Sequence, residues 1–202
     1  KIYGEAVALG NTTGEQRPYQ QCTQCVLDTH DDGSIQFDER GICTYCNRYK
    51  RLEGTRLFLG KDRERELRAV VARIKAARKH PKYDCIAGVS GGVDSSYVAL
   101  KMKQLGLTPL LVHLDNGWNT DISWQNIRGI VDHLGFDLHT FAPDAAEFRD
   151  IQLAFLRASV MDIEMPTDHA VVAYIYNLAN KLGIQYIISG DNFATEGVLP
   201  NG

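Results

Sequence analysis

The chain has 202 residues, 44% of them hydrophobic and 23% charged, and it carries a formal net charge of −3. This length allows one α/β domain with a sizeable core plus a small appendage. The slightly acidic balance excludes an overall basic field for nucleic acid, and no apolar run approaches the roughly 20 residues that a membrane span needs.

Residues 1–21 are polar and contain glycine, which predicts an arm or loop. No secretory hydrophobic segment stands in this stretch, so we expect a cytoplasmic protein. The first residue is Lys1 rather than Met, from which we expect that the natural N-terminus was processed or lies upstream.

Four cysteines follow with the spacing C-x2-C-x17-C-x2-C, formed by Cys22, Cys25, Cys43 and Cys46. Each C-x2-C pair can turn two thiolates toward one tetrahedral ion, and the spacing is typical of a structural zinc site. Two disulfides or four unrelated thiols are the alternatives, and a cytoplasmic compartment disfavours disulfides. We therefore predict a zinc module over residues 22–50, in which the alternating residues 34–38 form a short strand.

The next segment, residues 51–80, predicts an amphipathic helix that links this module to the rest of the chain. Leu67, Val70, Val71 and Ile74 follow the i, i+3, i+4, i+7 spacing of one helix face. Basic residues crowd the same segment. We favour a solvated helix face as their explanation, and a surface for nucleic acid or phosphate is the alternative.

Residues 81–202 alternate between strand-like and helical patterns. Strands are predicted at residues 83–89, 109–114, 137–141 and 185–188. Helices are predicted from the glycine-rich loop to Leu105, over 124–134 up to Gly135, from Asp144 onward, and from about Thr167 to Gly183. This order predicts an α/β fold with a doubly wound parallel sheet, in which ligands bind beyond the carboxyl ends of the strands.

The string S-G-G-V-D-S-S at residues 90–96 lies at one of those strand ends. Glycines let the backbone approach an anion closely, serines add hydroxyl donors, and the following helix presents its positive N-terminus. The expected anion ligands are two glycines and three serines: Gly91, Gly92, Ser90, Ser95 and Ser96. Asp94 would be repelled by bare phosphate, so its expected partner is the Mg²⁺ that accompanies a polyphosphate.

This string resembles the PP-loop of the ATP pyrophosphatase superfamily, the adenine nucleotide alpha hydrolases, which cleave ATP between the α- and β-phosphates. The resemblance implies that the loop binds ATP by its β- and γ-phosphates, with Ser90, Asp94 and Ser95 as catalytic residues.

Two further segments carry the same resemblance. His113 and Asp115, at the end of the second strand, are implied to contact the adenosine part of ATP, and Gly190 is implied to lie near the nucleotide. Packing of His113 at the strand end is the alternative. Glu196 is implied as a second Mg²⁺ ligand, and an ordinary exposed glutamate at a helix start is the alternative.

Residues 22–46, CTQCVLDTHDDGSIQFDERGICTYC, followed by this loop, resemble the N-acetyl sugar amidotransferases of bacterial surface-polysaccharide (O-antigen, lipopolysaccharide) biosynthesis. VHLDNGWN at residues 112–119 is also similar to that family. The resemblance extends from Cys22 to about Glu196. That family is longer than this chain, so we expect the chain to be part of a longer protein.

The resemblance implies an ATP-dependent amidation. The oxygen of a sugar N-acetyl group is adenylated with loss of pyrophosphate, and ammonia displaces AMP to leave an acetamidino sugar. The implied cofactors are structural Zn²⁺, ATP and Mg²⁺. The implied partners are a nucleotide-linked N-acetyl sugar and a separate glutaminase that channels ammonia, because the chain shows no glutaminase nucleophile of its own.

Two other functions stay open from the sequence. A tRNA-thiolating enzyme can also join zinc modules to a PP-loop, but it needs several further cysteines, and only Cys85 lies outside the zinc motif. We interpret Cys85 as a buried core thiol. A non-enzymatic zinc-ribbon nucleotide-binding protein would bind ATP without releasing pyrophosphate with any acceptor.

Overall fold

The computed structural model describes residues 17–56, 60–160 and 162–191, so the expected Mg²⁺ ligand Glu196 and most of the predicted arm lie outside the described residues. The chain divides into two compact units, one reaching to Gly60 and the other covering Lys61–Asp191. The four-part division expected from the sequence stays a prediction. None of the helices in the described ranges combines the length and the apolar character that crossing a bilayer requires.

The first unit is a small, loop-rich module that ends in helix α1 (Thr44–Arg56). Among the described residues of this unit, β-type pairing is limited to two isolated bridges, Gln21 with Asp28 and Phe37 with Cys43. The strand expected over residues 34–38 is therefore wrong. The alternation of that stretch arises because Ile35, fully buried, packs with the cysteines and partly buried Phe37 packs against the same cluster.

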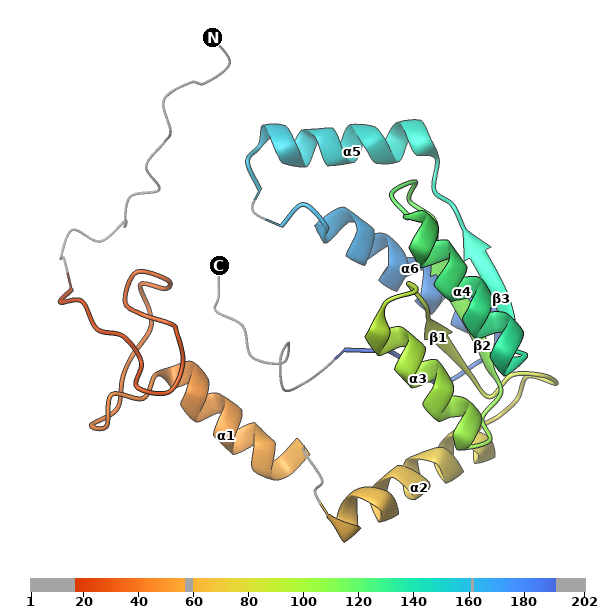
Figure 1. Ribbon diagram of the computed structural model, residues 1–202, viewed down its shortest axis with the longest axis horizontal. Helices are drawn as coiled ribbons and strands as arrows, with labels where there is room; N and C mark the ends of the chain where they lie inside the picture. Colours follow the sequence, from red (N-terminus) through yellow and green to blue (C-terminus); the bar gives the residue numbers. More distant parts are fainter. Residues whose placement is uncertain (1–16, 57–59, 161, 192–202) are drawn as a thin grey trace. The chain divides into compact units, whose positions relative to one another are not determined.

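The second unit contains a four-stranded parallel sheet in the order β3-β2-β1-β4 (Figure 1). The strands are β1 (Cys85–Gly88), β2 (Pro109–Leu114), β3 (Asp137–Phe141) and β4 (Ile187–Ile188). The sequence predicted β2 and β3 with these bounds and made β1 and β4 longer than they are. In register, Gly88 pairs with Val112 and Ile86 pairs with Ile187.

Helices cover both faces of this sheet. One apolar cluster joins Cys85, Ala87 and Leu111 to α2 (Lys61–Ala76), α3 (Val93–Gln104) and α4 (Asp121–Leu134). The other joins the alternate residues Ile86 and Leu110 to α6 (Met165–Leu182), while α5 (Ala145–Arg157) follows β3 (Figure 1). Because successive strand residues face opposite sides of a sheet, this alternation confirms the doubly wound α/β fold.

Helix ends agree closely with the sequence. Gly135 and Gly183 close α4 and α6 in the left-handed conformation, with φ of 66° and 67°. Asp144 caps α5, its side chain accepting hydrogen bonds from the backbone N–H groups of Ala146 and Glu147. These signals are local, since a left-handed glycine or a capping carboxylate needs no distant partner.

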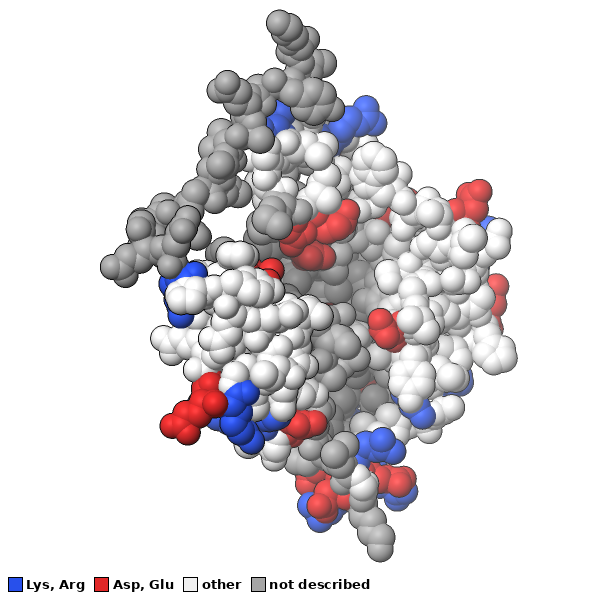
Figure 2. Space-filling view, turned by 60° about the vertical axis from the view of Figure 1, so that its left-hand side comes forward, with Lys and Arg blue, Asp and Glu red and all other residues white. Residues whose placement is uncertain are grey.

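Helix α2 confirms the amphipathic pattern over Lys61–Ala76, burying Val71 and Ile74 against the core. Two of its exposed basic side chains pair along the helix, Arg65 with Asp62 at 2.9 Å and Arg68 with Glu64 at 2.8 Å. On the face that Figure 2 shows, Lys and Arg are interspersed with Asp and Glu. These observations agree with a solvated helix face.

The strand order creates a reversal point beside β1. The chain runs from β1 through α3 to β2 and through α4 to β3, and β4 then returns to the opposite side of β1. The crevice outside the carboxyl ends of β1 and β4 is where open α/β sheets bind ligands. The glycine-rich loop leaves β1 at this point.

Candidate nucleotide-binding site and metal centre

The loop between β1 and α3 is built around Gly91, whose φ is +79°. A Cβ at this position would lie 2.5 Å from the backbone oxygen of Ser123 in α4. Both the left-handed backbone and the close approach require glycine here. The loop therefore lies directly against the start of α4.

The loop serines bond within the loop. The Ser95 hydroxyl donates to the Gly92 carbonyl at 3.3 Å and accepts from the Ser90 backbone N–H at 3.2 Å, and the two hydroxyls of Ser90 and Ser95 are 3.2 Å apart. Ser96 donates its hydroxyl to the Gly92 carbonyl at 2.6 Å. These contacts fold the loop into a compact turn, and Ser90 and Gly92 remain exposed to solvent.

Asp94 lies in the first turn of α3 and is exposed. Among the described residues, no hydrogen bond or ion pair engages its carboxylate. The first N–H groups of a helix lack intrahelical partners and favour an anion. A carboxylate beside such donors suits a cation bound together with a phosphate.

His113 is buried at the end of β2, where it is only 3% exposed. Its Nδ1 donates to the Val89 carbonyl at 2.9 Å, because a carbonyl can only accept. Its Nε2 has no partner among the described residues, and its ring meets Trp124 edge-on at 4.9 Å between centroids. His113 therefore contacts the backbone that leads into the loop.

Asp115 shapes the turn after β2. Its Oδ1 accepts hydrogen bonds from the Gly117 backbone N–H at 3.1 Å and from Asn119 Nδ2 at 3.0 Å. Trp118, in the same turn, is 70% exposed, and its indole N–H donates to buried Gln152 at 3.0 Å. The turn is therefore held by its own side chains and by a hydrogen bond to α5.

Gly190 follows β4 and lies against the start of α3. A Cβ on Gly190 would be 3.3 Å from the backbone nitrogen of Ser95. The fold thus brings together Gly190, His113 and the loop, which are far apart in the sequence. Asp115 follows two residues after His113.

A pocket of about 600 Å³ opens at this reversal point, lined by the ends of β1 and β4 and by the first half of α6. Asp168 and Asp191 add carboxylates to its wall. Burial, and then the neighbouring carboxylates of Asp162, Glu164 and Asp191, raise the pKa of Asp168. The pocket therefore combines an apolar strand floor with a wall that carries two carboxyl groups.

Two residues of α4 contact the loop, and sequence reasoning missed both. The Ser123 hydroxyl donates to the Ser90 carbonyl at 2.8 Å, and Asn126 Nδ2 donates to the Gly91 carbonyl at 2.9 Å. They lie three residues apart, on one face of the helix. No local motif marks them, because their role depends on α4 packing beside α3.

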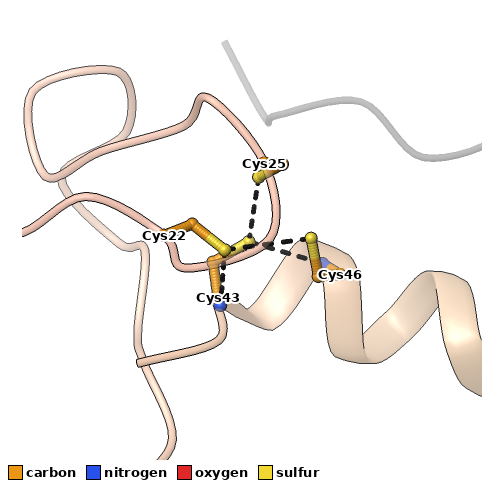
Figure 3. A group of neighbouring side chains, drawn as sticks. All are labelled: Cys22, Cys25, Cys43 and Cys46. Atoms are coloured by element: carbon orange, nitrogen blue, oxygen red, sulfur yellow. Dashed lines mark hydrogen bonds between the residues drawn. The ribbon is translucent and has the colours of Figure 1, made fainter. Parts of the chain in front are cut away.

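The four predicted zinc ligands converge in the first unit (Figure 3). The sulfurs of Cys22, Cys25, Cys43 and Cys46 all lie within 4.8 Å of one another. Cys22 Sγ is 3.9 Å from Cys46 Sγ, and Cys25 Sγ is 3.7 Å from Cys43 Sγ. A tetrahedral ion with bonds of about 2.3 Å to sulfur requires edges of about 3.8 Å. The donor set and its spacing therefore suit Zn²⁺.

Backbone N–H groups also point at these sulfurs. Burial opposes ionisation of the Cys22 thiol, but N–H groups of Cys43, Gln24 and Cys25 outweigh it and lower the pKa of Cys22 to about 6. Burial and the neighbouring thiols raise the pKa of Cys46. Four adjacent thiolates repel one another, so a bound cation is what would hold them all ionised.

Replacing Cys43 by Ala should remove the metal and unfold the first unit, because metal binding supplies folding free energy to a module with few apolar residues. Zinc content by mass spectrometry and thermal unfolding would measure this. Cys85→Ala is a matched control, since both cysteines are fully buried. It should keep the zinc. A Cys43→Ala protein that retains both zinc and its thermal transition would contradict a structural metal site.

Comparisons with known proteins give a remote relationship. No protein-family model matches the chain. Over 119 residues it is 25% identical to the tRNA(Ile)-lysidine synthase of Thermus thermophilus, and the same match is found in two strains of that organism. The match covers 58% of this chain and 22% of the synthase, so the chain spans about a fifth of the length of the curated relatives it matches.

Solved structures give weaker similarities. NMN synthetase from Francisella tularensis superposes with a TM-score of 0.48 and 20% identity, covering 67% of this chain and 56% of that one. NH3-dependent NAD synthetase from Campylobacter jejuni superposes with a TM-score of 0.48 and 14% identity, covering 64% of this chain and 56% of that one.

The sequence similarity to the lysidine synthase and the loop after β1 support a relationship to the PP-loop, or adenine nucleotide alpha hydrolase, superfamily. They do not distinguish one family within it.

Proposed function

We propose that the chain is the nucleotide-binding part of an ATP-dependent amidotransferase that converts a sugar N-acetyl group to an acetamidino group. The observation that carries the ATP half of this proposal is the loop itself. It gathers two glycines, three hydroxyls and the N-terminus of α3 at the reversal point of the sheet, with Asp94 exposed beside them. Such a site suits a polyphosphate bound with Mg²⁺.

The loop favours cleavage between the α- and β-phosphates. A P-loop lysine neutralises the β- and γ-phosphates during γ-phosphoryl transfer, and residues 90–96 contain no lysine. The loop would hold pyrophosphate as the leaving group, with Ser90, Ser95 and the first N–H groups of α3 as donors. Asp94, joined by Glu196, would hold Mg²⁺, which supplies charge neutralisation on the departing pyrophosphate.

The chemistry divides into two displacements. The acetamido oxygen of the sugar attacks the α-phosphorus, and the bond to the bridging oxygen breaks with its electron pair leaving on pyrophosphate. Ammonia then adds to the activated carbon, loses a proton, and AMP departs with the former acetamido oxygen. The chain's contribution is to fix the nucleotide so that this phosphorus faces the acceptor.

The sugar acceptor is proposed from the resemblance of residues 22–46 and 112–119 to the N-acetyl sugar amidotransferases of surface-polysaccharide biosynthesis. Ammonia would come from a separate glutaminase. Cys85 is fully buried in β1, where burial and then Asp84 raise the pKa of its thiol to about 12. The other four cysteines form the metal cluster. None of the five suits a glutaminase nucleophile.

A tRNA acceptor is the second candidate, and the similarity to the lysidine synthase favours it. The thiolating version of this function needs accessible thiols, and the burial of Cys85 argues against it. Along α2, Arg65 and Arg68 pair with acidic side chains, which reduces the positive charge that this helix offers to a nucleic acid. A nucleotide-binding protein without enzyme activity would bind ATP and release no pyrophosphate.

The test is product analysis. Full-length protein with ATP, Mg²⁺, ammonium and candidate nucleotide-linked N-acetyl sugars should form AMP and pyrophosphate only when an acceptor is present. The product sugar should show the mass change of oxygen replaced by NH and should gain positive charge on ion exchange. ADP and orthophosphate formed in step with turnover would overturn the assignment of the loop. AMP formation with tRNA instead of sugars would move the assignment to the second candidate.

A further inference from the structure

Helix α4 contacts the phosphate-binding loop through two side-chain hydrogen bonds. The Ser123 hydroxyl donates a hydrogen bond to the Ser90 carbonyl at 2.8 Å. The Asn126 amide donates one to the Gly91 carbonyl at 2.9 Å. We propose that Ser123 and Asn126 are positioning residues that keep the loop in its anion-binding conformation before any nucleotide arrives. The proposal rests on the proposed function only in assuming that the loop binds the pyrophosphate end of a nucleotide.

These two hydrogen bonds fix the orientation of the Ser90–Gly91 and Gly91–Gly92 peptide groups. In a planar trans peptide the C=O and the following N–H point in opposite directions. With the carbonyls of Ser90 and Gly91 turned toward α4, the N–H groups of Gly91 and Gly92 point away from that helix. The Gly92 backbone N–H donates to the Ser90 hydroxyl oxygen at 3.4 Å, which places this N–H on the side where the loop hydroxyls gather. A flip of either peptide would present a carbonyl oxygen to the anion, which repels it.

The helix end that supplies these donors is itself fixed. Thr120 caps α4, its side chain accepting from the Ser123 backbone N–H at 3.2 Å. The close contact between Gly91 and the Ser123 backbone leaves the loop no room to approach further. Ser123 and Asn126 therefore project from a helix end that is fixed in place, as preorganisation of a site requires.

The proposal predicts a selective loss of pyrophosphate affinity. Calorimetric titration of full-length Ser123→Ala and Asn126→Ala with Mg²⁺–pyrophosphate should give a Kd about fivefold higher for each, the change that loss of one ordinary hydrogen bond produces. Affinity for AMP, which lacks the β- and γ-phosphates, should stay as in the unchanged protein. The KM for ATP should rise with kcat little altered.

Two further variants separate positioning from general stability. Gln125→Ala also removes a carboxamide side chain, at an exposed residue next to Asn126, and should leave pyrophosphate binding unchanged. Ser123→Thr keeps the hydroxyl and should restore most of the affinity that Ser123→Ala loses. If Asn126→Ala does not fold, the pair Ser123→Ala and Ser123→Thr decides the question.

Equal pyrophosphate affinity in the unchanged protein and in folded Ser123→Ala and Asn126→Ala would overturn the positioning role. Loss of AMP and pyrophosphate affinity in equal measure would overturn it too, since that is the behaviour of a merely structural contact. If the unchanged protein itself binds neither ATP nor Mg²⁺–pyrophosphate, the proposed function fails first. The two failures are therefore distinguishable.

Discussion

Asp94→Asn should reduce pyrophosphate release by about a hundredfold to ten-thousandfold while the protein stays folded. The change removes a proposed Mg²⁺ ligand, and the charge stabilisation that a metal supplies in a transition state is typically several kcal/mol. Asp94 is exposed in the first turn of α3 and no described residue depends on its carboxylate, so packing should not suffer. Steady-state pyrophosphate release at saturating Mg²⁺, with acceptor present, measures the effect.

Asp121→Asn provides the matched control, because Asp121 is also an exposed aspartate in the first turn of a helix of the same unit. Both variants should show similar thermal unfolding, since each loses the same favourable contact with a helix N-terminus. Only Asp94→Asn should lose turnover. Near-normal pyrophosphate release by folded Asp94→Asn would remove Asp94 from the metal site.

Gly91→Ala should abolish measurable ATP binding. The residue would have to adopt φ of +79°, which costs about 1–2 kcal/mol for an L side chain. Its methyl group would also lie 2.5 Å from the Ser123 backbone oxygen, so the loop must leave its position. Titration with ATP and thermal unfolding would together measure the loss of binding and the loss of stability.

Gly183→Ala is the control that separates the loss of stability from the loss of ATP binding. Its φ is +67°, and no atom lies within 4 Å of where a Cβ would stand. It should therefore lower stability through the backbone conformation alone and leave ATP binding intact. If Gly91→Ala binds ATP as well as Gly183→Ala does, the close contact of the loop with α4 is not needed for the site.

Local chemistry explains which elements the sequence predicted well. The helix ends at Gly135 and Gly183 and the cap at Asp144 depend on one residue and its immediate neighbours. The cysteine cluster was equally predictable, because a metal site requires a fixed ligand spacing rather than a particular fold. Prediction failed at residues 34–38, where burial under the cysteines produces the alternation that a strand also produces.

The parts of the site that sequence could not predict are contacts between distant elements. The loop serines were expected as hydroxyl donors to an anion, and the sequence did not show that the hydroxyls of Ser90 and Ser95 also bond to each other. His113 was expected either at the adenosine or packed at a strand end, and it is buried against the Val89 carbonyl. Ser123 and Asn126 became visible only once α4 was placed beside α3. The ligand roles of Ser90, Asp94, His113, Asp115 and Gly190 stay predictions.

The position of β4 at the far side of β1 also dictates when this site can exist during biosynthesis. Ile86 and Ile187 pair directly although roughly one hundred residues separate them in the chain. Strands β1, β2 and β3 and their helices can assemble as the chain emerges, whereas the wall that Gly190 provides must wait for residue 190. Contacts of such long separation form late and slowly. A nascent chain would therefore carry the complete loop for some time before it had a nucleotide pocket, and ATP would stabilise only the finished sheet.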